Sequence, residues 1–266
     1  MSTSRKQPSA KAALLVFLGY IAVVVGMNRI FASDFNFDEV VSSASPPRDG
    51  IVLPVGVASI YLAGIATLYG WWRPALFEPR DRPSLPKWLW VIPIAGIAGF
   101  MSDIARSEHR DAFTNEHWRY LISGFLLVGF SEELMTRGLL VAGFRSAWSE
   151  FRVYAGTTAL FGLMHGLNFF FGQDAATTVK QVLGVIPMAT AFYIIRRISG
   201  SLVLAMLFHA LLDFSLVVFG GPDASINQLD PDAGTPIGAL LPMYLSIIAI
   251  IVHRKRFFSK RVGNAS

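Results

Sequence analysis

Cysteine is absent from the 266 residues of this chain. Its absence excludes disulfide bonds, thiolate metal ligands, cysteine nucleophiles and lipid anchors on cysteine. Charged residues are scarce, at 15% of the chain, whereas soluble domains carry about 25%. Hydrophobic residues make up 53%, and a helix needs about 20 mostly apolar residues to cross a bilayer. The composition therefore predicts an integral membrane protein with several spans.

Eight apolar segments predict an all-α, polytopic membrane helix bundle with about eight transmembrane helices. They lie near residues 12–31, 51–72, 86–102, 118–143, 153–171, 178–195, 201–219 and 235–253. Neither an internal repeat nor a second domain is visible, so residues 1–266 are predicted to form a single membrane domain. The third segment is short and rich in Trp and Pro. An alternative with seven spans would place this segment in the membrane interface.

Lys and Arg are distributed unevenly between alternate loops, and this bias sets orientation in membranes. With a cytoplasmic N-terminus, Arg137 lies inside a helix and 16 of the 23 Lys and Arg residues fall on the cytoplasmic side. Six fall outside, namely Arg29, Arg48, Arg106, Arg110, Arg119 and Lys180. The loops near 34–49 and 223–232, also predicted outside, are acidic. Both termini are therefore predicted in the cytoplasm, with the chain in the plasma membrane. The spread of basic residues over many loops argues against nucleic-acid binding.

Ionisable side chains lie deep in the fourth, fifth and seventh segments, where each full charge costs about 2.5–3.5 kcal/mol. They are Glu132, Glu133, Arg137, His165, His209 and Asp213. A four-residue spacing places Glu133 and Arg137 on one helix face, where they can pair. The same spacing relates His209 to Asp213, and Phe161 to His165. Glu132 is turned by about 100° from Glu133, so it can point toward a site.

The predicted topology places the ionisable residues of three helices at a common depth. Glu132, His165, His209 and Asp213 lie about 8–12 residues, or roughly 12–18 Å, from the cytoplasmic ends of their segments. This common depth predicts a shared cavity. Simpler interpretations stay open: Glu133 and Arg137 could only fix helix packing, and Phe161 could only pack. The histidines and Asn168 could only form hydrogen bonds between helices.

Three motifs follow one another on these segments. Residues 132–137 read E-E-x-x-x-R, residues 161–165 read F-x-x-x-H and residues 209–213 read H-x-x-x-D. In this order, within about residues 118–219, they resemble the CAAX protease and bacteriocin-processing (CPBP, also called ABI) family of intramembrane proteases. That family includes the type II CAAX prenyl endopeptidases. The resemblance implies an endopeptidase with a water-accessible cavity toward the cytoplasm, acting on membrane-associated or CAAX-like protein or peptide substrates.

The resemblance also divides the motif residues into two groups: Glu132, His165, His209 and Asp213 are expected to be catalytic, and Glu133, Arg137 and Phe161 to support the site. Glu132 and His165 would activate water, and His209 and Asp213 would bind the developing oxyanion or position the site. The third motif departs from the family because it ends in Asp213, where the prenyl-processing enzymes have Asn. An ionised Asp cannot donate a hydrogen bond to an oxyanion. Asp213 is therefore expected either to be protonated or to orient His209.

The residue types leave two catalytic chemistries open. The resemblance favours a metal-independent, glutamate-dependent mechanism without a cofactor. In the alternative, Glu132, His165 and His209 would bind a zinc ion with water in the fourth position. The helical zinc-protease motif H-E-x-x-H is absent, which weakens this alternative without removing it.

Two other functions could use the same residues. An ion-coupled transporter would use the buried charges as a proton path, although no inverted repeat is visible. A catalytically silent membrane scaffold or immunity-type protein would keep the fold and bind partners. The sequence predicts a lipid bilayer and a membrane-associated substrate as partners, but neither the substrate's identity nor the oligomeric state.

Overall fold

The computed structural model describes residues 7–33, 47–220 and 237–259. These residues form helices joined by turns, and their only β-type contact is a single bridge between Phe77 and Ser201. The predicted all-α class is confirmed. The two loops predicted to be acidic and outside lie mostly beyond this part of the chain, at residues 34–46 and 221–236.

The helices of the described part coincide with the eight apolar segments. The first four segments are α1 (Ala10–Phe31), η2 and α2 (Pro47–Val52 and Leu53–Leu68), η3 and α4 (Lys87–Trp90 and Val91–Arg106), and α5, η5 and α6 (Asn115–Glu133, Leu134–Leu140 and Val141–Phe144). The other four are α7 and η6 (Glu150–Met164 and His165–Phe171), α8 (Ala175–Ser199), α9 (Leu202–Gly220) and α10 (Ile237–Phe258). Two short helices, α3 (Trp72–Leu76) and η4 (Arg110–Ala112), lie in the connections.

Six of these segments are long and apolar enough to cross a membrane, so the chain is an integral membrane protein. They are Ala10–Phe31, Pro47–Leu68, Lys87–Arg106, Ala175–Ser199, Leu202–Gly220 and Gly238–Phe258. The third segment is among them, which favours a span over an interfacial position. The two remaining segments are those that carry Glu132 and His165. Eight spans and the orientation of the bundle stay predictions.

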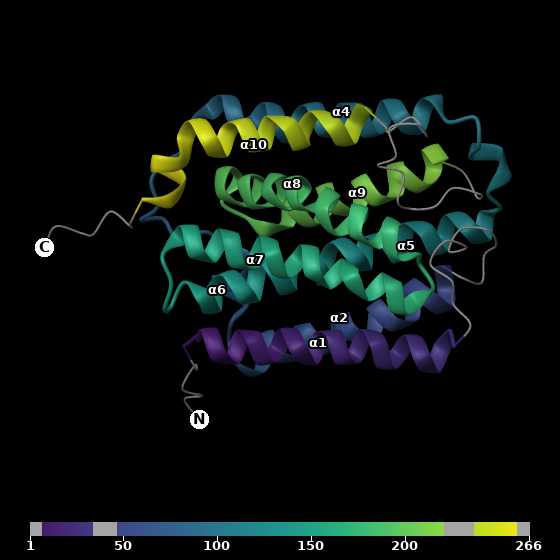
Figure 1. Cartoon of the computed structure of the whole chain (residues 1–266), viewed down its shortest axis with the longest axis horizontal. Coiled ribbons are helices and arrows are strands. Elements are labelled where there is room, and N and C mark those ends of the chain that lie inside the picture. Colours follow the sequence, from purple (N-terminus) through teal and green to yellow (C-terminus); the bar gives the residue numbers. More distant parts are fainter. Residues whose placement is uncertain (1–6, 34–46, 221–236, 260–266) are drawn as a thin grey trace, which may run out of the picture.

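The bundle has a central group of helices covered on two sides. Helices α5, α7, α8 and α9 lie in the middle, α4 and α10 pack against α8 and α9, and α1 and α2 pack against α5 and η5 (Figure 1). The first turn of α1, the last turn of α10 and the turn between α6 and α7 lie at the same end of the bundle (Figure 1). This arrangement agrees with two termini on one side of the membrane.

Glycines let the central helices approach closely. A side chain at Gly129 of α5 would collide with the Met206 carbonyl and with Ala210 of α9. Gly99 of α4 and Gly238 of α10 meet in the same way. Small residues of this kind allow close packing of membrane helices, where the hydrophobic effect does not drive association. Gly129 lies one turn before Glu132, and Met206 and Ala210 lie on either side of His209, so the close approach of α5 and α9 occurs next to these two side chains.

A buried ionic cluster joins the connections at the end of the bundle where α6 meets α7. The Glu78 carboxylate accepts hydrogen bonds from Arg145 Nη1 and Nη2 at 3.1 and 3.0 Å and from Arg196 Nε at 2.7 Å. The Glu150 carboxylate accepts from Arg145 Nη2 at 2.6 Å and pairs with Arg82 at 2.7 Å. The cluster therefore fixes the turn that precedes α7.

Glu78 is expected to make the stability of the protein depend on pH. Burial acts to raise the pKa of Glu78, but the guanidinium groups of Arg196 and Arg145 outweigh it and hold the pKa at about 2, compared with an ordinary value of 4.5. A lowered pKa stabilises the folded state above the ordinary value, and this stabilisation is lost as the pH falls toward 2. We expect Glu78→Gln to lower the free energy of unfolding at pH 7 by about 3 kcal/mol.

Unfolding in detergent micelles between pH 2 and pH 7 measures this effect. The difference between wild type and Glu78→Gln should be largest above pH 4.5 and should shrink toward pH 2. Glu108→Gln, at an exposed position, is the matched control and should change little. A Glu78→Gln protein with wild-type stability at pH 7 would contradict the prediction.

Candidate active site

Three helices carry the motif residues to one place in the bundle. Glu132 lies in the last turn of α5, His165 lies where α7 passes into the tighter η6, and His209 and Asp213 lie in the middle of α9. Directly after Glu133, the chain winds as a π-helix over Leu134–Leu140. Such wide turns are rare and often occur at functional sites, and this one carries Arg137.

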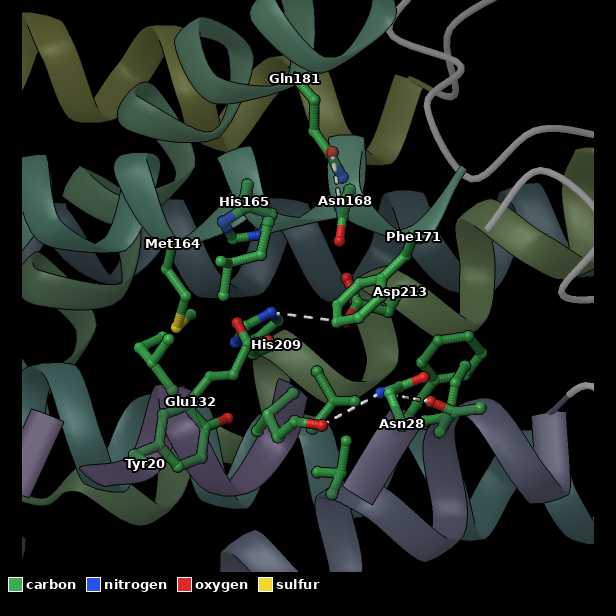
Figure 2. A pocket seen from close by; sticks show the side chains of 18 residues that line it. Tyr20, Asn28, Glu132, Met164, His165, Asn168, Phe171, Gln181, His209 and Asp213 are labelled. Atoms are coloured by element: carbon green, nitrogen blue, oxygen red, sulfur yellow. Dashed lines mark hydrogen bonds and ion pairs between the residues drawn. The ribbon is translucent and has the colours of Figure 1, made fainter. Parts of the chain in front are cut away.

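Glu132, His165, His209 and Asp213 line one cavity of about 150 Å³. Figure 2 shows these four side chains around it, with Tyr20 and Asn28 of α1 on the side of Glu132. Asn168 and Gln181 contribute two amide groups, and residues such as Val24, Ile51 and Phe171 supply apolar walls. A cavity of this size holds several water molecules, since one needs about 10–15 Å³.

Glu133 is the centre of a buried ionic group. Its side chain is completely buried, and its Oε1 accepts hydrogen bonds from Arg137 Nη1 at 2.8 Å and from His209 Nδ1 at 3.1 Å. The Arg137 guanidinium lies over the rings of Phe161 and Phe192, 4.0 and 5.1 Å from their centroids. The predicted pairing of Glu133 with Arg137 is present, and Phe161 covers the pair. The bond to His209 was not predicted.

His209 is held between two carboxylates and an aromatic ring. Its Nδ1 faces Glu133, and its Nε2 lies 3.4 Å from Asp213 Oδ2. Its ring stacks on Phe192, with centroids 4.5 Å apart and an interplanar angle of 22°. Only the imidazolium form donates from both ring nitrogens, so these two partners favour a cationic His209. A protonated His209 would place a positive charge next to the cavity.

His165 has its ring orientation and tautomer set by its own helix. Its Nδ1 lies 2.9 Å from the backbone carbonyl oxygen of Phe161. A carbonyl can only accept, so Nδ1 carries the proton and donates. In the neutral ring, Nε2 is then an acceptor. The four-residue spacing in F-x-x-x-H thus gives Phe161 two contacts. Its backbone carbonyl holds the ring of His165, and its own ring covers Arg137.

Glu133 is held through its Oε1, whereas among the described residues no hydrogen bond holds the carboxylate of Glu132. Its Oε2 is buried, and none of the residues in the described ranges hydrogen-bonds to this atom. A buried polar atom without a partner costs about 1–3 kcal/mol and calls for an explanation such as a catalytic role or a bound water. Because Glu132 borders the cavity, its carboxylate is available to a molecule inside.

Comparison with known families shows what this arrangement is similar to. Residues 114–215 match the protein-family model described as type II CAAX prenyl endopeptidase Rce1-like. The resemblance to the CAAX protease family is confirmed. This Rce1-like segment spans α5 to α9 and includes all three motifs. Among curated proteins, none matches the chain significantly.

Part of the cavity wall lies before the Rce1-like segment. Tyr20 and Asn28 of α1 face the cavity, and Tyr20 Oη lies 3.3 Å from Ser131 Oγ, next to Glu132. Neither residue was predicted, because a single Tyr or Asn in an apolar helix is an ordinary feature. Phe192 was also missed, although it contacts both Arg137 and His209. In the sequence, Phe192 stands out only as one residue of a long apolar run, which does not mark it as part of a site.

The set proposed for zinc, Glu132, His165 and His209, does not fit a metal ion as arranged. Among the described residues, no three His, Asp or Glu side chains come together in a way that could hold one. Both ring nitrogens of His209 already face carboxylates. His165 donates from Nδ1 to the Phe161 carbonyl and could offer Nε2 as a ligand, but a single histidine ligand is too few for a zinc site. We therefore derive no catalytic step through a metal.

Proposed function

We propose that this protein is an intramembrane endopeptidase that hydrolyses peptide bonds of membrane-associated substrates in the cavity, with water activated by Glu132 and His165. The observation that carries the proposal is the Glu132 carboxylate, which borders a cavity large enough for water and whose buried Oε2 has no hydrogen-bond partner among the described residues. The match to an Rce1-like family supports peptide hydrolysis as the class of reaction.

In the first step, Glu132 accepts a proton from a water molecule, assisted by His165 Nε2. The water oxygen bonds to the carbonyl carbon of the substrate, and the electron pair of the C=O bond moves to the oxygen. The resulting oxyanion is stabilised by the positive charge of His209, since fixed charges aimed at a developing charge are often the largest catalytic contribution. The C–N bond then breaks, and the proton held by Glu132 passes to the leaving amine. As the C–N bond breaks, the oxyanion re-forms the C=O bond, so the products are a carboxylic acid and an amine, which then exchange a proton to become a carboxylate and an ammonium group.

The remaining motif residues position the cation. Glu133 holds His209 Nδ1 and is itself held by Arg137. Asp213 Oδ2 lies 3.4 Å from the other ring nitrogen of His209, Nε2. This contact supports the interpretation that Asp213 orients His209. Asp213 can do this as a carboxylate, so the departure from the family's Asn does not require a protonated side chain.

The cavity is proposed to open toward the cytoplasm, and labelling of introduced cysteines tests this orientation in a chain without native cysteine. Ser149 and Ala112 are exposed at opposite ends of α5–α7. We expect an impermeant thiol reagent to label Ser149→Cys only from the cytoplasmic side and Ala112→Cys only from outside. The reverse pattern would overturn the orientation and leave the chemistry untouched.

The reaction is proposed to be independent of metal ions. We expect a strong chelator to leave the cleavage rate of the purified protein unchanged, because carboxylate and imidazole supply the base and the charge. The measurement is the rate before chelation, after chelation and after zinc is added back. Loss of activity that zinc restores would favour a Lewis-acid mechanism.

The experiment that tests the function is cleavage of a defined peptide by purified protein in lipid vesicles. Because the matching family is described as prenyl endopeptidases, a farnesylated CAAX-type peptide is the first substrate to try. Precursors trapped in cells by an inactive Glu132 variant supply the next ones. We expect two fragments whose masses add up to the substrate plus one water. Proton-driven uptake without cleavage would favour the transporter, and a phenotype that survives Glu132→Ala would favour the scaffold.

A further inference from the structure

Asn168 and Gln181 form an amide pair on the wall of the candidate active site. Asn168 Nδ2 donates to Gln181 Oε1 at 2.8 Å, and this bond links η6, three residues after His165, to α8. The expected hydrogen bond between helices is present, but both residues also line the cavity. Figure 2 shows the pair on the opposite side of the cavity from Tyr20 and Glu132.

The pair keeps unused hydrogen-bonding groups. An amide side chain has one oxygen acceptor and two N–H donors, and their mutual bond uses one donor of Asn168 and the acceptor of Gln181. In the described part of the chain, no other group hydrogen-bonds to Asn168 Oδ1 or Gln181 Nε2. Both residues are partly exposed. Asn168 Oδ1 can therefore accept a hydrogen bond from a molecule in the cavity, and Gln181 Nε2 can donate one. An acceptor and a donor of this kind complement the N–H and C=O groups of a peptide main chain.

A second cavity places Gln181 on a path through the site. This cavity has a volume of about 80 Å³, and Val185, Met188 and Met243 are among its apolar walls. It shares four lining residues with the first cavity, namely His165, Gln181, His209 and Asp213. An extended peptide that occupies both cavities would therefore pass the catalytic histidines and the amide pair together.

We propose that Asn168 and Gln181 bind the main chain of the peptide substrate, with Asn168 Oδ1 accepting from a substrate N–H and Gln181 Nε2 donating to a substrate carbonyl. This inference rests on the proposed function. It explains how the site aligns a scissile bond beside Glu132 and His165 without reading particular side chains. Asn168 and Gln181 are binding residues in this account and take no part in proton transfer.

Peptides in which single amides are replaced by esters test the contact, because an ester lacks the N–H donor. In the wild type, one ester position outside the scissile bond should lower kcat/KM by about 3–10-fold, mainly through a higher KM. In Asn168→Ala, all-amide peptides should be cleaved more slowly, and the same ester should cause no further loss. A merely structural role of Asn168 would slow both peptides equally and leave the ester effect in place.

A second variant and a control keep the result decisive. Gln181→Leu removes the donor, so it should lose the response to a thioamide, a weaker acceptor, at one substrate carbonyl. Asn28→Ala alters another cavity residue, whose Nδ2 already points to the Val24 and Gly50 carbonyls, and should keep both effects. Ester and thioamide effects that persist in the Asn168 and Gln181 variants would overturn the inference. Failure of the wild type to cleave any all-amide peptide would instead overturn the proposed function.

Discussion

Replacing Glu132 by glutamine is expected to lower the rate of peptide cleavage by about 10²–10⁴-fold, the usual contribution of a general base. Glutamine has the size of glutamate and can hydrogen-bond, but it cannot take a proton from water. The substitution should leave the fold unchanged, because the buried Oε2 of Glu132 has no hydrogen-bond partner among the described residues. The measurement is the single-turnover cleavage rate at saturating substrate.

Two controls separate chemistry from folding in this experiment. The thermal unfolding of Glu132→Gln in micelles should match that of the wild type. Glu116→Gln changes an exposed glutamate on the same helix and should keep full activity. Cleavage by Glu132→Gln within threefold of the wild-type rate would remove Glu132 from the mechanism.

Replacing Glu133, the neighbouring residue, is expected to act on stability. Its carboxylate is completely buried and accepts from both Arg137 and His209. Glutamine at this position leaves Arg137 without its counter-charge, and breaking a buried ion pair in this way costs about 3–5 kcal/mol. Unfolding of Glu133→Gln in micelles should therefore show a loss of this size.

Glu116→Gln again serves as the matched control, since it removes the same charge from an exposed site of α5. The decisive comparison is between the adjacent glutamates: Glu133→Gln should lose stability and Glu132→Gln should lose activity with stability retained. Equal stability losses for the two variants would contradict the division of roles.

The helices and the meeting of the motifs could be predicted from the sequence. Long apolar runs mark membrane helices directly, and charges inside them must face one another or water. Together with the predicted topology, these rules predicted that Glu132, His165 and His209 share one cavity, and the three residues do line one cavity. They did not settle the number of spans, because the segments with Glu132 and His165 are not among the six that are long and apolar enough to cross a membrane.

The finer geometry depends on contacts that no spacing encodes. The π-helix after Glu133 interrupts no apolar pattern, so the sequence gives no sign of it. A four-residue spacing suggested that Asp213 is the partner of His209, but Glu133 from another helix forms the shorter contact, at 3.1 Å compared with 3.4 Å. Contacts between helices of this kind depend on how closely α5 and α9 approach at Gly129.

Hydrolysis in water labelled with ¹⁸O tests most directly whether Glu132 activates water against a peptide bond. Wild-type protein in vesicles is mixed with limiting peptide for a single turnover, and the new carboxyl terminus is weighed by mass spectrometry. The account predicts one ¹⁸O atom in that carboxylate during the first turnover, and little or no product from Glu132→Gln. Unlabelled product with ¹⁸O left on the protein, or labelled product formed equally fast by Glu132→Gln, would contradict it.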